Sequence, residues 1–139
     1  MILVDTSAWV EFERATESSV DLRLTELIAD GGPIATTEPV LMEMLAGARS
    51  RRHENELRRL LLSFELLSFD VAVDFEAAAS VYRRCRSAGI TPRGIVDCMI
   101  AAVASRTGAC LLAHDRDIVR VARVMELDLD EVSLRDADT

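Results

Sequence analysis

The stretch ILVDTS, residues 2–7, decides how the fold of this chain is interpreted. Its apolar half has the length of a short buried strand. The Asp-Thr-Ser that follows is typical of a helix start, because each of these side chains accepts hydrogen bonds from the first backbone amides of a helix. The stretch therefore predicts a strand that leads directly into a helix, with a carboxylate, Asp5, at the junction.

Strand and helix patterns continue to alternate along the chain. Short apolar runs predict further strands at residues 34–36, 66–69 and 110–113, and the tail at residues 127–132 is expected to add an edge strand. Capping residues and terminal glycines predict helices over about residues 18–29, 37–47, 51–62, 73–89, 92–106 and 117–125. Thr37 is expected to cap the helix that it begins.

This alternation indicates a mostly parallel sheet covered on both faces, a three-layer α/β/α sandwich. A chain of 139 residues fits one domain, so residues 1–139 are expected to fold as a unit. Ligands of such sheets bind beyond the carboxyl ends of the strands. Asp5 follows the first expected strand and Asp115 closely follows the fourth, so both should lie at the same edge of the sheet.

Composition excludes several classes of protein. Half of the residues are apolar, which is enough for a core, but no apolar run approaches the roughly 20 residues of a membrane helix. The start of the chain carries no basic segment, so a signal peptide is not expected. Cys85, Cys98 and Cys110 lack the C-x-x-C spacing of a zinc site, and their odd number fits a reduced, cytoplasmic protein.

The net charge of −8, taken alone, argues against a nucleic-acid partner. The charge is unevenly distributed, however, because residues 49–125 are basic while both ends are acidic. All 16 basic residues are arginines, whose guanidinium groups bind phosphates in a fork. Arg49, Arg51, Arg52 and Arg93 are therefore candidate RNA contacts. The alternative is that these arginines simply lie on solvent-exposed helix faces and bind no RNA.

Four carboxylates lie among residues that otherwise resemble core: Asp5, Glu43, Asp97 and Asp115. An isolated buried carboxylate is costly unless it is paired or bound to a metal. The chain has no lysine, and no arginine lies within five residues of Asp5 or Glu43. A cluster of hard oxygen ligands of this kind favours Mg²⁺ or Mn²⁺, in one or two ions, over zinc.

Each acid also has a purely structural interpretation. Asp5 could cap its helix, although Thr6 or Ser7 could do so and leave Asp5 free for a metal. Glu43 could occupy the one solvent-facing stripe of an apolar helix. These alternatives stay open at the level of single residues.

Asp97 is the sharpest case, because it is the only charged residue in the apolar segment 95–104. The helix dipole stabilises an anion there by only about 0.3–1 kcal/mol, so a metal or the nearby Arg93 is expected as partner. Asp115 and Asp117 flank an arginine at the next helix start, where capping explains one of them. Asp115 is the better site candidate and Asp117 an accessory ligand.

His53 and His114 have no partners for a zinc site or a serine nucleophile. His114 is expected near the edge of the sheet that carries the acids, although a partly buried residue at a strand end is the simpler interpretation.

Together these motifs resemble the PIN-domain family and, within it, the toxin ribonucleases of bacterial VapBC-type toxin–antitoxin systems. The match rests on ILVDTS, EPVLMEML, IVDCMIAA and LLAHDRDI, in that order, and spans nearly the whole chain. The resemblance implies that Asp5, Glu43, Asp97 and Asp115 are catalytic metal ligands. It further implies that Thr6 or Ser7 supports Asp5 through a hydroxyl.

The implied activity is metal-dependent hydrolysis of RNA phosphodiester bonds. The resemblance also implies an antitoxin that masks the acidic site, and a homodimer. Because the chain has few aromatic residues, base stacking cannot supply most of the RNA affinity, so phosphate contacts should dominate.

Three rivals remain. A receiver domain or aspartate phosphatase also places an Asp after the first strand, but both normally need a lysine. A PIN-like module without catalysis would bind RNA or a partner without metal-dependent turnover. A DNA nuclease of related fold is disfavoured because the chain leaves no room for a duplex-binding module.

Overall fold

The computed structural model describes the backbone of residues 1–137 and the side chains of residues 1–134. Four strands form the central sheet: β1 (Ile2–Val4), β2 (Ile34–Thr36), β3 (Glu65–Leu66) and β4 (Cys110–Leu112). All pairings between them are parallel, and their order is β3-β2-β1-β4. The expected parallel sheet is confirmed.

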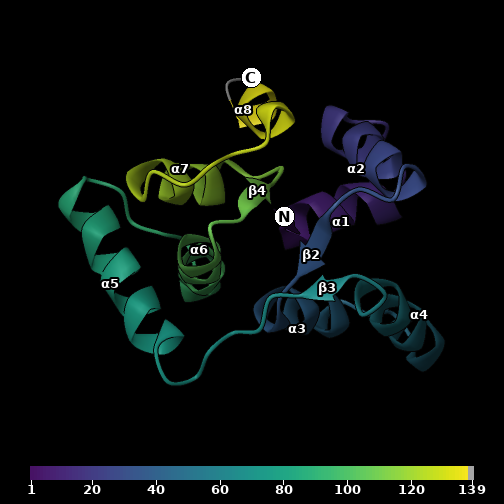
Figure 1. Ribbon diagram of the computed structural model, residues 1–139, viewed down its shortest axis with the longest axis horizontal. Helices are drawn as coiled ribbons and strands as arrows, with labels where there is room; N and C mark the ends of the chain where they lie inside the picture. Colours follow the sequence, from purple (N-terminus) through teal and green to yellow (C-terminus); the bar gives the residue numbers. More distant parts are fainter. Residues whose placement is uncertain (138–139) are drawn as a thin grey trace.

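Eight helices occupy the described residues. They are α1 (Thr6–Glu13), α2 (Ser19–Ala29), α3 (Glu38–Ala46), α4 (Arg51–Leu61), α5 (Asp74–Ser87), α6 (Ile95–Thr107), α7 (Arg116–Val124) and α8 (Glu131–Ala137). In Figure 1, α1 and α2 lie to the right of the strands, and α5, α6 and α7 lie to the left. Helices therefore flank both sides of the sheet, as the three-layer interpretation requires. No helix in the described part is long and apolar enough to cross a membrane.

The strand order creates a switch point beside β1. From β1 the chain proceeds to β2 and β3 on one side, and it later returns to β4 on the other side. Open parallel sheets bind their ligands at such a point, beyond the carboxyl ends of the strands. Asp5 lies there, and its backbone amide donates to Leu112 O at the end of β4 at 2.8 Å.

The core explains why these segments fold as they do. Leu3 and Val4 of β1 and Leu111 and Leu112 of β4 are fully buried. Trp9 of α1 is also fully buried, and the small residues of α6 allow that helix to pack closely against α5. The apolar α6 is therefore a buried helix, as its sequence predicts.

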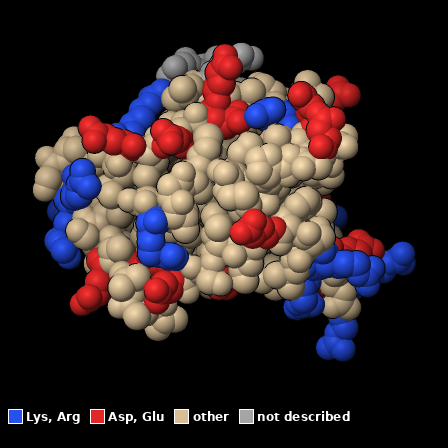
Figure 2. All heavy atoms as spheres, viewed as in Figure 1, with Lys and Arg blue, Asp and Glu red and all other residues tan. Residues whose placement is uncertain are grey.

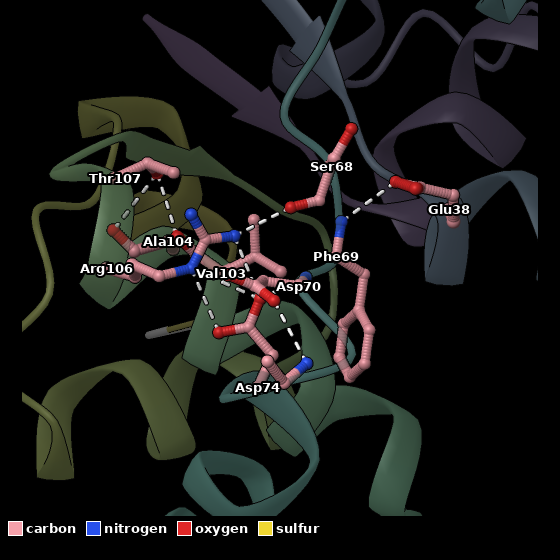
Figure 3. A network of polar contacts seen from close by, with 10 residues as sticks. Glu38, Ser68, Phe69, Asp70, Asp74, Val103, Ala104, Arg106 and Thr107 are labelled. Atoms are coloured by element: carbon pink, nitrogen blue, oxygen red, sulfur yellow. Dashed lines mark hydrogen bonds and ion pairs between the residues drawn. The ribbon is translucent and has the colours of Figure 1, made fainter.

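The third strand begins and ends earlier than predicted. Residues 65–66 pair with β2, whereas the predicted strand covered residues 66–69. Beyond the strand, side chains form hydrogen bonds with the backbone. Phe69 N donates to Glu38 at 2.9 Å, and Ser68 O accepts from Arg106 at 2.6 Å (Figure 3). These bonds replace the pairing that a longer strand would need.

The predicted edge strand at residues 127–132 forms only in part, as a single bridge. Only Leu129 forms a bridge, parallel to Leu111 of β4. The Asp130 side chain then accepts from Val132 N at 3.2 Å, and the chain turns into α8. A polar side chain that bonds its own backbone two residues on competes with the sheet ladder in this way.

Candidate active site

Asp5 occupies the N-cap of α1, and its two oxygens have different surroundings. Oδ2 accepts from Ser7 N at 3.0 Å and from Ser7 Oγ at 2.5 Å. Oδ1 is buried and has no hydrogen-bond partner. The predicted division, in which Thr6 or Ser7 caps and Asp5 stays free, is therefore not what is found: one oxygen of Asp5 caps the helix and the other has no hydrogen-bond partner.

The two hydroxyls after Asp5 serve different acids. Ser7 Oγ donates to Asp5 and also accepts from His114 N at 2.9 Å, which ties α1 to the end of β4. Thr6 Oγ1 donates instead to Glu43 Oε1 of α3, at 2.7 Å. Ser7 therefore supports Asp5, whereas Thr6 orients Glu43.

Asp97 lies in the first turn of α6 and is half-buried. The pKa of Asp97 is raised to about 7, mainly by burial and in part by the negative charges of Asp5, Asp115 and Glu43, against the lowering effect of Arg93. These mutual effects bring all four predicted acids into one electrostatic cluster.

The pKa of Asp5 follows the same pattern. Burial and, to a smaller extent, the charges of Glu43 and Asp115 together raise the pKa of Asp5 to about 6, although the hydrogen bonds from Ser7 act to lower it. Carboxylates that hinder one another's ionisation in this way are typical of a functional site.

Arg93 pairs across the site rather than along its own segment. Its Nη2 lies 2.5 Å from Asp115 Oδ2, and its Nε lies 3.1 Å from Asp117 Oδ2. No ion pair of Arg93 with Asp97 is found among the described residues, so the alternative in which Arg93 neutralises Asp97 directly is not supported. Asp115 also caps α7, because its Oδ1 accepts from Asp117 N at 2.7 Å.

The donor atoms of the cluster are of the type that binds divalent cations, but the side chains are not arranged as a complete metal site. Its donors are hard carboxylate oxygens, and Asp5 Oδ1 lacks any other partner. Within the part of the chain that is described, no three His, Cys, Asp or Glu side chains converge closely enough to hold a metal. Arg93 pairs with Asp115 and Asp117, and Thr6 donates to Glu43, so these three carboxylates already have partners.

His114 lies near the acids as expected, because its backbone amide donates to Ser7 Oγ at 2.9 Å, and its Nε2 lies 3.4 Å from Glu11 Oε1. Sequence reasoning missed the position of the other histidine. His53 contacts Glu13 of α1. The contact joins residues 40 positions apart, and no local pattern reports such a pair. Thr37 occupies the N-cap of α3, but its side chain makes no capping bond.

Comparison with known proteins identifies the family. The PIN domain family model matches residues 2–124. The chain belongs to the PIN-domain family.

Named relatives agree with that assignment. The chain is 44% identical over 128 residues to Ribonuclease VapC11 of Mycobacterium tuberculosis and to VapC ribonuclease Mb1587 of Mycobacterium bovis. The matched region covers 91% of this chain and 96% of each relative.

Solved structures show the same fold. VapBC2 from Rickettsia felis, bound to a DNA fragment from its promoter, aligns with a TM-score of 0.72 at 23% identity and covers 94% of this chain and 98% of the matched chain. VapC20 of Mycobacterium tuberculosis, a sarcin-ricin loop cleaving toxin, aligns with a TM-score of 0.67 at 21% identity, over 86% of this chain and 93% of that one. The expected PIN-like fold is confirmed.

Proposed function

We propose that this chain is a metal-dependent endoribonuclease and the toxin of a VapBC-type toxin–antitoxin pair. The observation that carries the proposal is the electrostatic cluster of Asp5, Glu43, Asp97 and Asp115 at the switch point of the sheet. Membership of the PIN family and 44% identity to named VapC ribonucleases support the same activity.

One or two Mg²⁺ or Mn²⁺ ions are proposed as cofactor. Asp5 and Asp97 would hold the metal, Glu43 and Asp115 would complete the set, and Asp117 would be an accessory ligand. When bound, such an ion polarises a phosphate and lowers the pKa of a coordinated water.

The chain's own residues prepare this site. Ser7 binds one oxygen of Asp5 through two hydrogen bonds and leaves the other oxygen without a partner, and Thr6 orients Glu43. Arg93 neutralises Asp115 and Asp117 while no cation is present, and its exposed guanidinium can then turn to an RNA phosphate.

Basic side chains on α4 are proposed to guide the RNA backbone. Arg51, Arg52 and Arg59 line an open concave surface on that helix, and Figure 2 shows blue side chains gathered there at the lower right. Arg49 precedes the helix. Phosphate contacts of this kind attract RNA without reading its sequence.

An antitoxin that masks the acidic cluster, a homodimer and a cytoplasmic location complete the proposal. They rest on the family and on neighbours solved as VapBC complexes. Copurification with the product of an adjacent gene would test the first of these.

Metal dependence gives the direct test. The purified chain, free of any partner, should cut total cellular RNA at discrete positions with Mg²⁺ or Mn²⁺ and not with EDTA. Identically purified Asp97→Asn protein controls for contaminating nucleases. Equal cleavage by both proteins, or none by either folded protein, would favour a PIN-like module that binds without turnover.

Substitutions at Asp5 separate helix capping from catalysis. Asparagine caps as well as aspartate, so Asp5→Asn should keep the stability of α1 but lower the cleavage rate by roughly 10²-fold or more. Asp5→Ala should lose both, at an added cost of about 1 kcal/mol in unfolding free energy. Urea unfolding and RNA cleavage measure the two effects. Full activity in Asp5→Asn would remove Asp5 from the catalytic set.

A further inference from the structure

A cavity of about 230 Å³ opens beside the acidic cluster, between α1, α3 and α4. Thr6 and Glu43 line one part of it, and Arg14, Arg49 and His53 line another. The cavity thus connects a hydroxyl–carboxylate pair of the cluster with two guanidinium groups on adjacent segments.

The loop that carries Arg49 is fixed by His53 and Glu13. Arg49 N donates to Nδ1 of His53 at 3.0 Å, so the ring carries its proton on Nε2, which contacts Glu13 Oε1. The Arg49 guanidinium lies 3.7 Å from the same oxygen, but its side chain is 77% exposed. A guanidinium has five N–H donors, so most of them remain available for a ligand.

Arg14 supplies a second cation at the same cavity. It is the C-cap residue of α1, its side chain is exposed, and no ion pair holds it within residues 1–134. The two carboxylates that also line the cavity already have donors: Glu43 accepts from Thr6, and Glu13 is engaged by His53 and Arg49.

We propose that Arg14 and Arg49 form a phosphate subsite that binds the RNA backbone next to the bond that is cut. The proposal rests on the ribonuclease function proposed for the acidic cluster and adds the residues that would position the substrate there. Guanidinium groups bind phosphate oxygens in a bidentate fork. Among the described residues, no Phe, Tyr or Trp lines the cavity, which favours phosphate recognition over base stacking.

The chain offers a matched control. Arg86 is an exposed arginine of α5 that does not line the cavity, so Arg86→Ala removes the same charge elsewhere. Arg49→Lys keeps the positive charge at the cavity but removes the bidentate hydrogen bonding of the guanidinium group.

Two measurements test the subsite. The first is the affinity for a labelled single-stranded RNA in EDTA, by fluorescence anisotropy over a series of KCl concentrations. Arg14→Ala and Arg49→Ala should each weaken binding about 10-fold and lower the salt slope by about 0.7, the value for one lost phosphate contact on a single strand. Arg49→Lys should keep most of the slope but lose affinity.

The second measurement is steady-state cleavage with metal. The alanine variants should raise KM by a similar factor and leave kcat within about twofold, because the subsite contacts a neighbouring phosphate and not the one that reacts. Arg86→Ala should match the wild type in both assays.

Three outcomes would overturn the subsite. In the first, the cavity variants behave like Arg86→Ala. In the second, kcat falls while KM and RNA affinity stay unchanged. In the third, the variants bind RNA normally but lose affinity for an acidic peptide, which would assign the cavity to a protein partner. Failure of the wild type to cleave any RNA, with binding still dependent on Arg14 and Arg49, would instead remove the ribonuclease function and keep the anion site.

Discussion

Asp97→Asn is expected to abolish RNA cleavage, with a rate loss of roughly 10³-fold. The substitution conserves shape and removes one negative charge at the centre of the acidic cluster. A neutral amide binds a divalent cation far more weakly than a carboxylate does, so the site would lose its proposed metal. Cleavage of a defined RNA at saturating Mn²⁺ measures the loss.

The same substitution should stabilise the metal-free protein at alkaline pH. The pKa of Asp97 is raised from 3.8 to about 7, so the folded state binds more protons than the unfolded state between these values. Stability therefore falls as pH rises through this window, and asparagine avoids that loss. In EDTA at pH 8, the Tm of Asp97→Asn should exceed that of the wild type by roughly 3–6 °C, and the difference should vanish below the unfolded pKa of 3.8.

Asp128→Asn provides the control, because Asp128 is exposed and lies outside the cluster. It should leave both cleavage and Tm unchanged. An inactive Asp97→Asn protein that is also less stable at pH 8 would contradict the electrostatic argument, since the activity loss would then reflect misfolding.

The fold and the position of the acids could be predicted from local patterns. The alternation of apolar runs and helix caps predicts a parallel sheet, and the carboxyl ends of parallel strands meet at one edge. That is enough to place Asp5 and Asp115 together. The lone charge in the apolar α6 predicts Asp97 in the same way.

Contacts between distant segments could not be predicted. The bond from Thr6 to Glu43, the pairing of Arg93 with Asp115 and the contact of His53 with Glu13 each depend on how helices pack. The sequence around an exposed arginine does not indicate which residue it will pair with. The cavity beside the cluster therefore emerges only in three dimensions.

Arg106→Ala is expected to cause the largest loss of stability among the ion pairs. The Asp74 carboxylate is 1% exposed, and Arg106 binds it through Nε at 3.0 Å and Nη2 at 2.8 Å while also donating to Ser68 O (Figure 3). Removal of the arginine leaves a buried charge supported mainly by Asp70 N. Such a loss costs about 3 kcal/mol in unfolding free energy, which urea unfolding at pH 7 would measure.

The pH dependence of the free energy of unfolding would identify the charge on Asp74 as the cause of the stability loss in Arg106→Ala. Burial acts to raise the pKa of Asp74, but the hydrogen bonds from Arg106 and Asp70 outweigh it, and the pKa lies below 3.8. A lowered acid pKa contributes stability above the unfolded value and loses it as pH falls through the folded value. The difference between wild type and Arg106→Ala should therefore narrow below about pH 3.8.

A double substitution separates a buried charge from lost packing. Asp74→Asn/Arg106→Ala leaves no unpaired ion, so it should be more stable than Arg106→Ala alone even though it removes more of the network. Arg58→Ala, which breaks an exposed pair with Glu54 within α4, should cost less than about 0.5 kcal/mol. If the double variant were the least stable of the three, the charge on Asp74 would not explain the stability loss. The network would then act through packing of the Arg106 side chain between α6 and the connection that leads to α5.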